Sequence, residues 1–494
     1  MRDLPGGWIA AKLSELATPR GERVPPAAHP DKQFVGLEHV ESQTTRILGS
    51  VSAAEVKSSA SLFRAGDVLY GRLRPYLNKV AKPDFDGLAS AEFIVFPDQA
   101  HLRSGFLKHR LNAGDFASFA THLNAGDRPR VDFEQIGAFD IALPPPAEQQ
   151  RIVEKLEELL SDLDAGVTAL ERARSNLKRY RAAVLKAAVE GRLTEKWRAA
   201  HTDTEPAEIL LERILSERRK KWEEAQIKKY AAKEQSPPKG WKDRYPEPAT
   251  PKAEALPALP TAWCWATLDQ LADIGTGATP LRSEAKYWEG GSIPWVTSAV
   301  VNSPYVSEAS EFVTPAALAE TNLFLYPANT LVLAMYGEGK TRGKASELLL
   351  EATTNQALAA LVFFEAASAC RSYVKTFLAK SYEDMRRLAS GGVQPNLNLG
   401  LIKEMRIPLP PLDEQAQITM VIDRLLSVQE RLVQESEKSA LRGSRLRQAI
   451  LKRAFEGKLV PQDTKDEPAS ELLARIRAGR AVRVGEGRSR RTRK

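Results

Sequence analysis

Apolar residues recur at alternating steps of three and four along one long stretch of the chain. Positions with this spacing are Ile152, Leu156, Leu159, Leu163, Leu170, Leu177 and Val184, with Gly166, Ala173, Tyr180 and Ala187 filling the intervening positions. This seven-residue pattern is typical of a helix that packs on another helix. Prolines 144–146 precede the stretch and Gly191 ends it. We therefore expect a helix from about Glu148 to Gly191, roughly 65 Å long at 1.5 Å per residue.

A second stretch, from about Glu414 to Glu456, predicts a second long helix. Its apolar face carries Ile418, Ile422, Leu425, Leu432, Leu446 and Ile450, and the stripe is interrupted at Gln429, Ser436, Ser439 and Gly443. Neither helix can leave an apolar stripe in water, and each has the other as a partner of equal length. An antiparallel pairing gives a pseudo-two-fold arrangement. The alternative is that each helix packs on its own domain.

The sequence segments that flank these helices, which we call the frame, occur twice in the chain. Residues 5–8 (Pro-Gly-Gly-Trp) return 255 positions later as 260–263 (Pro-Thr-Ala-Trp). Residues 143–149 return 266 positions later as 409–415, and 190–193 return as 456–459. Residues 205–208 return at 467–470, so the first copy carries four extra residues in its connection from 194 to 204. The chain is predicted to be an internal repeat.

Between the matching frames the two copies diverge. Residues 20–140 and 275–405 share little beyond strand-like fragments such as 67–70 and 330–333. One scaffold with two different inserts is expected when a common frame presents two distinct binding surfaces; drift after a gene duplication is the alternative. A charged helix is expected between Thr204 and Glu234, followed by a proline-rich extended linker from Ser236 to Pro260.

Length and charge change this picture only modestly. With 494 residues the chain should form several domains, and 71 basic against 63 acidic residues permit a polyanion as partner. The C-terminal end is the most basic part, with Arg475, Arg477, Arg480, Arg483, Arg488, Arg490, Arg491, Arg493 and Lys494 against Glu486. This tail is expected either to touch phosphates or only to aid solubility. No run of 18 apolar residues or signal-like start occurs, so we expect a cytoplasmic location and no membrane contact.

Residues that would carry chemistry are missing from the sequence. Cys264 and Cys370 stand far apart, and the six histidines form no paired ligand pattern. The stretch 337–344 resembles a phosphate loop, but Glu338 and Ala345 occupy two of its defining positions. A nuclease-like set of Asp31, Glu55 and Lys57 is the kind that arises by chance. We expect no catalytic residue, metal site or cofactor.

The two inserts carry basic, aromatic and amide side chains on expected loops, in place of catalytic residues. The candidates for DNA contact are Arg72, Arg74, Tyr76, Lys79, Arg128 and Arg130 in the first insert, and Arg282, Lys286, Lys340, Arg342, Lys344, Gln394 and Asn396 in the second. Arginine can bind guanine edges with two hydrogen bonds, glutamine and asparagine can do the same for adenine, and lysine binds phosphates. The alternative is solvated surface charge around a buried Trp288.

At this point the arrangement resembles the specificity subunit of type I restriction-modification enzymes, over nearly the whole chain. The fragments that carry the resemblance are Leu-Pro-x-x-Trp at Leu4 and Leu259, Thr279-Pro280, residues 287–296 (Tyr-Trp-Glu-Gly-Gly-Ser-Ile-Pro-Trp-Val), residues 354–357 (Thr-Asn-Gln-Ala), both Pro-Pro-x-x-Glu-Gln helix starts, and residues 190–194 with Trp197-Arg198. The first insert lacks the Tyr-Trp-x-Gly-Gly pattern of the second, so it is similar to a different subclass of recognition domain.

The resemblance implies an α+β protein in which two mixed α/β target-recognition domains are separated by two long antiparallel helices, a coiled coil with a pseudo-two-fold internal repeat. The expected boundaries are 1–146 for the first target-recognition domain, 147–235 for the central helical region, 236–258 for the linker, 259–412 for the second target-recognition domain, 413–478 for the C-terminal helical region and 479–494 for the basic tail.

The resemblance also implies partners. These are double-stranded DNA with a split, asymmetric target, two copies of an adenine methyltransferase subunit docked along the helices, and two motor-nuclease subunits. The methyl donor and ATP would then belong to those subunits, and the chain itself would be non-catalytic. Two alternatives are an autonomous DNA-modifying or DNA-cleaving enzyme, which needs the motifs not found, and a structural coiled-coil adaptor, which leaves the two basic inserts unexplained.

Overall fold

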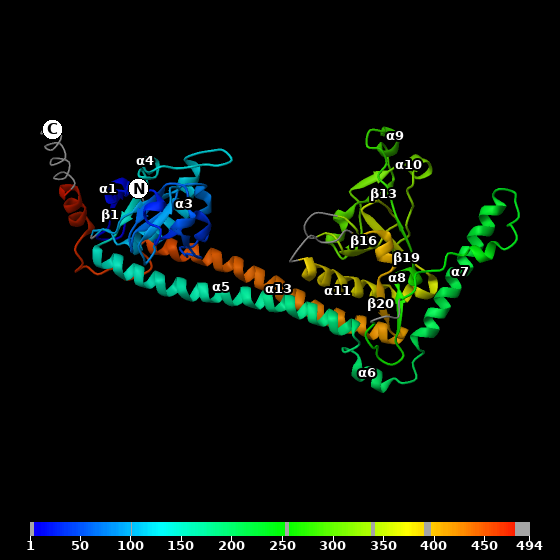
Figure 1. The fold of residues 1–494 in the computed structure, drawn as a ribbon. Coiled ribbons are helices and arrows are strands. Elements are labelled where there is room, and N and C mark those ends of the chain that lie inside the picture. The colour runs from blue at the N-terminus through cyan, green and yellow to red at the C-terminus, as the bar shows by residue number, and fades with distance from the viewer. Residues whose placement is uncertain (1–3, 100, 252–255, 337–340, 390–396, 480–494) are drawn as a thin grey trace. The chain divides into compact units, whose positions relative to one another are not determined.

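The chain divides into two compact units, and two helices belong to both. Unit 1 is Met1–Arg172 with Glu435–Lys494, and unit 2 is Ala173–Gln434. The structure, a computed structural model, describes residues 4–99, 101–251, 256–336, 341–389 and 397–479 (Figure 1). The long helices α5 (Pro146–Val189) and α13 (Leu412–Phe455) confirm both helices expected from the seven-residue pattern.

Unit 1 combines small sheets with short helices. Its five-stranded sheet has the order β2 (Arg23–Val24), β5 (Ala60–Phe63), β8 (Gly87–Ser90), β3 (Gln33–Val35) and β4 (Val51–Ser52). A three-stranded sheet is ordered β7 (Val80–Ala81), β6 (Val68–Gly71) and β9 (Phe93–Phe96), and β1 (Ile9–Lys12) pairs with β10 (Asp140–Leu143). The helical segments are α1 (Leu13–Leu16), η1 (Pro26–Ala28), η2 (Leu37–His39), η3 (Ala53–Glu55), η4 (Pro75–Leu77), α2 (Ser104–Asn112), α3 (Gly114–His122) and α4 (Phe133–Ile136).

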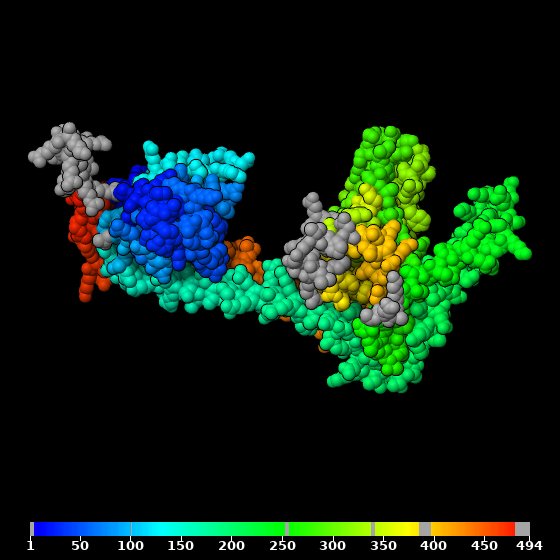
Figure 2. All heavy atoms as spheres, in the orientation of Figure 1, coloured from blue at the N-terminus to red at the C-terminus, as the bar shows by residue number. Residues whose placement is uncertain are grey.

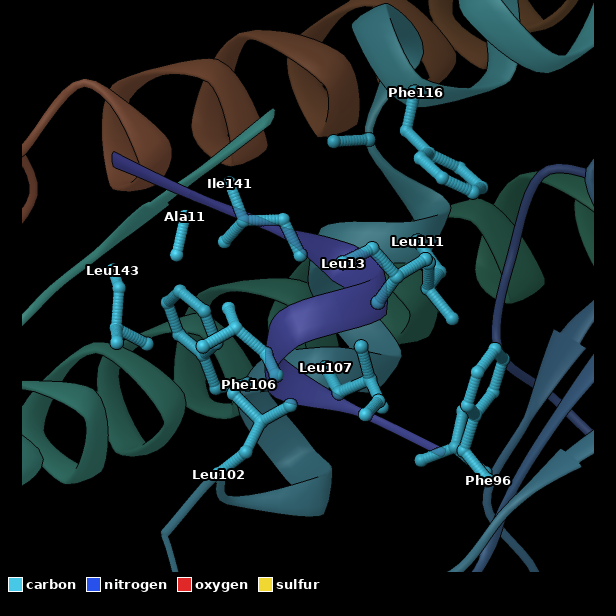
Figure 3. Close-up of a cluster of buried hydrophobic side chains, with 14 of the residues drawn as sticks. Ala11, Leu13, Phe96, Leu102, Phe106, Leu107, Leu111, Phe116, Ile141 and Leu143 are labelled. Atoms are coloured by element: carbon cyan, nitrogen blue, oxygen red, sulfur yellow. The ribbon is translucent and has the colours of Figure 1, made fainter. Parts of the chain in front are cut away.

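The main core of unit 1 lies where these elements meet the long helices. Leu13 of α1, Phe106 of α2 and Ile141 of β10 are fully buried and point toward one another (Figure 3). Residues from the far end of the chain complete this cluster: Leu451 and Ala454 of α13, and Leu472, Leu473 and Ile476 of the helical segment that follows. The first and last parts of the sequence therefore share one core.

Unit 2 repeats this plan with different sheets. The larger sheet is ordered β12 (Ala272–Thr276), β19 (Leu358–Phe363), β16 (Leu331–Ala334), β17 (Ala345–Leu348) and β14 (Tyr305–Val306). The smaller sheet is ordered β15 (Glu311–Val313), β13 (Ile293–Val296) and β18 (Thr353–Thr354), and β11 (Cys264–Thr267) pairs with β20 (Arg406–Leu409). The helical segments are α6 (Glu195–Ala200), α7 (Ala207–Ala231), η5 (Trp241–Arg244), α8 (Leu268–Leu271), α9 (Ala285–Trp288), η6 (Ser298–Asn302), α10 (Pro315–Glu320), η7 (Glu365–Cys370), α11 (Arg371–Ala389) and α12 (Leu399–Lys403).

The repeated motifs make the same contacts in both units. The Trp8 indole Nε1 donates to the Glu148 Oε2 at 3.0 Å, and the Trp263 Nε1 donates to the Glu414 Oε2 at 2.8 Å. The following glutamines, Gln149 and Gln415, each donate from Nε2 to a proline carbonyl five residues earlier. The repeated start of each long helix is therefore a structural joint, because a buried carboxylate and amide need partners.

A second repeated contact ties the start of each copy to a helical segment further along the chain. The Ala207 N–H donates to the Ala262 carbonyl, and the Ala469 N–H donates to the Gly7 carbonyl, both at 2.9 Å. Gly191 and Gly457, which follow the long helices, have φ of +70° and +69°. At both positions an added Cβ would clash with a proline, Pro260 or Pro5. The internal repeat is thus confirmed down to individual hydrogen bonds.

The longer connection of the first copy contains α6. From this helix the Arg198 guanidinium pairs with the Glu414 Oε1, which also accepts a hydrogen bond from the Thr194 hydroxyl at 2.7 Å. Glu148 has no such partner for its Oε1 among the residues that the structure describes. The insertion therefore makes the two joints electrostatically different.

The contact face of α13 agrees with the expected one only in part. Leu432 and Leu446 are 52% and 51% exposed, and Tyr180 of α5 is 43% exposed, so their assignment to the seam was wrong. The buried positions are instead Gln429, Ser436, Gly443 and Arg447, between Ile422 and Ile450. In unit 1 Arg447 pairs with Asp164 of α5, and in unit 2 Arg181 of α5 lies 3.8 Å from Glu430. The helices pack antiparallel, and their interface is partly polar.

The helices of the described part of the chain include no segment that is both long and apolar enough to cross a membrane. The expected proline-rich linker is only partly extended, because η5 folds back so that Trp241 stacks on Trp222 of α7 at 5.8 Å between ring centroids.

Candidate nucleic-acid interface

The two candidate loops of the first insert lie together in unit 1. An isolated β-bridge joins Leu73 to Arg130, and the backbone N–H of Arg74 donates to the Pro129 carbonyl at 2.7 Å. The Arg72 carbonyl accepts from the Val131 N–H at 3.0 Å. Loop 72–79, which follows the buried strand β6, and loop 126–130 thus form one surface.

Arginine side chains dominate this surface. The Nε atoms of Arg72 and Arg74 have no hydrogen-bond partner within the described residues, although both atoms are buried. Arg74 also has a φ of +52°, which is uncommon for a residue with a side chain, and such backbone strain often marks functional loops. Arg128 is exposed, as is Tyr76, whereas Arg130 pairs with Glu92 at 2.6 Å. Arg128 and Tyr76 therefore offer exposed donors to a ligand at this surface, whereas the Nε atoms of Arg72 and Arg74 are not exposed.

Lys79 is placed differently from the arginines. Its ammonium donates to the Leu37 carbonyl at 2.6 Å, so this side chain fixes the loop against η2.

A neighbouring loop that the sequence did not indicate adds an amide to this surface. The backbone N–H of Gln43 lies 3.2 Å from the carbonyls of both Leu77 and Asn78, and its side-chain Nε2 donates to the Tyr76 carbonyl at 2.8 Å. Gln43 is exposed and has a φ of +65°. Only tertiary contact reveals this placement, because residues 41–46 contain no distinctive motif.

In unit 2 the four basic candidates that the structure describes fall on two separate parts of the insert. Arg282 and Lys286 lie beside the smaller sheet. The Arg282 guanidinium stacks on Trp288, 4.0 Å from the ring centroid, and pairs with Glu311. Lys286 of α9 pairs with Glu320 of α10 at 2.6 Å. Trp288 is half-buried and donates to the Leu281 carbonyl.

Lys344 lies on the larger sheet, just before β17. Its Nζ donates to the Asn302 Oδ1 of η6 at 2.9 Å, and both residues line a groove of about 640 Å³ bounded by α5, α11 and α13. This groove carries acidic as well as basic side chains, among them Glu347, Asp423 and Glu430. Arg342 is half-buried in the same hairpin. Lys340, Gln394 and Asn396 lie outside the described residues.

A polar contact links two of the motif fragments in unit 2. The Thr279 hydroxyl donates to the Gln356 Oε1 at 2.6 Å, which brings Thr279-Pro280 beside Thr-Asn-Gln-Ala at 354–357. Gln356 is exposed, next to the loop that carries Arg282. The motif itself was visible in the sequence, but its amide was not among the candidates, because nothing in the spacing placed it near that loop.

The nuclease-like set does not assemble into one visible site. Glu55 and Lys57 line a hollow of about 530 Å³ whose other lining residues include Phe34, Glu38 and Ser90, and Asp31 is not among them.

The two units thus carry two different sets of basic, aromatic and amide side chains on one repeated helical frame. The chain belongs to the family described as the type I restriction modification DNA specificity domain, whose model matches residues 55–176 and 260–440. Membership in this family makes DNA-sequence recognition the role of the chain, as a non-catalytic subunit that works with DNA and with other restriction-modification subunits.

Individual relatives agree with this assignment. The chain is 25% identical over 384 residues to the type I restriction enzyme EcoDI specificity subunit of Escherichia coli, covering 73% of each chain. It is 23% identical over 423 residues to the EcoKI specificity subunit of Escherichia coli strain K12, covering 82% of this chain and 76% of that one. A solved structure titled "Structural basis underlying complex assembly and conformational transition of the type I R-M system" matches 93% of this chain and 100% of its own with a TM-score of 0.66 at 20% identity, which supports the fold.

Proposed function

We propose that the chain reads a split, asymmetric DNA target, one half-site with each insert. The observation that carries this is the pair of loops on equivalent strands. In unit 1, β6 leads into Arg72 and Arg74, whereas in unit 2 the hairpin of β16 and β17 carries Arg342 and Lys344. Different donors at equivalent positions recognise different base edges, so the two half-sites should differ in sequence.

The proposed contact residues are those of the two surfaces. They are Arg72, Arg74, Tyr76, Lys79, Arg128 and Arg130 for one half-site and Arg282, Lys286, Lys340, Arg342, Lys344, Gln394 and Asn396 for the other, with Gln43 and Gln356 added from the structure. The proposed target-recognition domains are residues 1–146 and 259–412.

The proposed assembly contains two methyltransferase subunits and two motor-nuclease subunits in the cytoplasm. Outward-facing apolar side chains on α13 support docking of a protein along the helices, because large exposed apolar residues mark interaction surfaces. In unit 2 these are Met420, Val428 and Leu432, which are 58%, 46% and 52% exposed. The methyltransferase would then supply adenine methylation at the half-sites that the inserts select.

The test uses the chain assembled with its methyltransferase subunits. Mapping methylated adenines identifies the target, and competition with duplexes altered in one half-site at a time measures each contact. Replacing Arg72 and Arg74 with alanine should cost about 1–3 kcal/mol for each base contact that is removed and relax one half-site only.

Replacing Arg342 and Lys344 is the matched experiment for the other half-site. Equal losses at both half-sites in either variant, or a palindromic target, would contradict the proposal. Methyl transfer by the chain alone, measured with a radiolabelled methyl donor, would support an autonomous enzyme instead, and an assembled complex without DNA binding would support an adaptor.

A further inference from the structure

Helix α7 continues past the part that has a counterpart in the second copy of the repeat. Its first turns pack in unit 2, where Ala207, Leu210 and Ile214 are buried. These positions correspond to Ala469, Leu472 and Ile476, which are buried in unit 1. From Arg218 to Arg244 the chain forms the rest of α7 and returns along it through η5, and we call residues 218–244 the arm. The arm projects beyond the rest of unit 2 (Figures 1 and 2).

Positive charge is concentrated in the arm. Residues 218–244 hold ten basic and four acidic side chains, a net charge of +6, whereas the whole chain has +8. Acidic side chains take up part of this charge: Glu223 binds Lys242 at 2.8 Å and Arg219 at 3.5 Å, and Glu217, just before the arm, binds Lys221 at 2.6 Å. The excess charge lies on exposed cations whose side chains have no partner among the described residues, namely Lys220, Lys228, Lys229, Lys233, Lys239 and Arg244.

Aromatic contacts hold the arm together. Trp222 stacks on Trp241 and packs edge-on against Tyr245, whose hydroxyl accepts from Arg218 at 2.6 Å. Lys242 lies over the Trp241 ring, 5.7 Å from its centroid. The exposed face of the arm therefore consists mainly of lysines. Ile227 is a large apolar side chain exposed there. Protein interfaces are depleted in lysine and rich in aromatic residues, whereas phosphate contacts are made by lysine and arginine.

We propose that the arm binds the phosphate backbone of double-stranded DNA without reading its sequence. The inference rests on the proposed DNA-reading function and adds to it a contact outside the two base-reading surfaces. A projecting, lysine-rich helix with no free aromatic or amide cluster in its described residues fits a regular row of phosphates. Each lysine that neutralises a phosphate releases a condensed counterion, so the contact adds affinity that falls as salt rises.

The experiment measures salt-dependent DNA binding by the chain in complex with its methyltransferase subunits. A variant with Lys220→Gln, Lys228→Gln, Lys229→Gln and Lys233→Gln removes four exposed charges and leaves the aromatic contacts intact. Binding is followed with a labelled duplex that carries the mapped target and with one that lacks it, across a potassium chloride titration. The plot of log affinity against log salt has a negative slope, and its magnitude should decrease by about 0.9 for every phosphate that the variant no longer neutralises.

If the variant no longer neutralises two or more phosphates, affinity at about 0.1 M salt should drop at least roughly tenfold, by the same factor on both duplexes. Glu224→Gln is the matched control of opposite sign, because this exposed carboxylate lies on the same helix; it should leave binding unchanged or strengthen it on both duplexes.

Three results would overturn the inference while the DNA-reading function stands. They are an unchanged slope and affinity in the four-lysine variant, a loss confined to the target duplex, and a failure of the variant to assemble with its subunits, which would assign the arm to a protein partner. If the unaltered complex does not distinguish the two duplexes, the proposed function itself fails and the inference fails with it.

Discussion

At the residue scale, the repeat provides a comparison of one carboxylate in two settings. Glu414 is bound by Trp263, Thr194 and Arg198. Its counterpart Glu148 is bound by Trp8 through one oxygen, and the other oxygen is buried without a partner in the described chain. Burial raises the pKa of Glu148 above its usual range, against the opposing effects of the Trp8 hydrogen bond and of Arg151. The same residue is therefore incompletely satisfied in unit 1 and well satisfied in unit 2.

Glutamine at the two positions should have opposite effects. Because the folded-state pKa of Glu148 is raised, its contribution to stability is fully present below the unfolded pKa and is lost as pH rises through the folded pKa. Glu148→Gln keeps an acceptor for Trp8 and removes the buried charge, so the stability of unit 1 should depend less on pH above the ordinary glutamate pKa of 4.5 and should not fall at neutral pH. Glu414→Gln leaves Arg198 without its counter-ion and should destabilise unit 2 by about 2 kcal/mol.

Hydrogen exchange resolved along the sequence, measured across pH, assigns each effect to its unit. Losses of equal size at neutral pH in both variants would show that the extra partners of Glu414 do not matter.

At the element scale, the sequence predicts both long helices but only part of the buried face of α13. Proline and glycine mark the ends of α5 and α13, and these signals are local. The buried face of α13 instead follows Ile422, Gln429, Ser436, Gly443 and Ile450 at steps of seven, a row whose polar and small members the apolar pattern treats as interruptions. An added Cβ at Gly443 would lie 3.1 Å from Val167 Cγ2, so a small residue there lets the helices approach closely.

The candidate nucleic-acid interface was likewise predictable from the sequence only in part. Arg72 and Arg74 were predicted as candidates because arginine on a loop is visible in the sequence, whereas their proximity to Arg130 is shown only by the bridge between the two loops. Gln43 was missed since its place depends on hydrogen bonds to Leu77 and Asn78, more than thirty residues away, and on a positive φ.

Two apolar residues of α13, both expected in the seam, should now behave differently. Ile422 is 4% exposed and Leu432 is 52% exposed. Ile422→Ala leaves a cavity and should destabilise unit 2 by about 3 kcal/mol. Leu432→Ala should change stability by less than about 0.5 kcal/mol but weaken assembly with the methyltransferase subunit. Urea unfolding and calorimetric titration of the partner separate the two effects, and a large stability loss in Leu432→Ala would restore the seam expected from the apolar pattern.

At the scale of the whole molecule, α5 and α13 are the two elements that both units share. α5 passes from unit 1 to unit 2 after Arg172, and α13 passes back after Gln434. Thr194 lies beyond the end of α5 at Val189, in the connection that contains α6, so residues added there do not lengthen either helix. A test of whether the helices set the spacing of the DNA target therefore changes both helices at once.

One added heptad in each helix, after Arg172 and after Gln434, should lengthen the unread spacer of the DNA target. Seven residues keep the seven-residue period of the buried row, so the packing within each unit is preserved. They add roughly 10 Å at 1.5 Å per residue, about three base pairs at 3.4 Å each. Each added pair also rotates one half-site by roughly 36°, which favours a smaller change, so we expect a spacer longer by about one to three pairs. The half-site sequences should stay the same, because no base-reading loop is altered.

Mapping methylated adenines for the double insertion measures the spacer directly, and the same insertion in α5 alone, which puts the two helices out of register, should abolish activity. Full activity of the double insertion on an unchanged spacer, or new bases in either half-site, would show that the paired helices do not set the spacing.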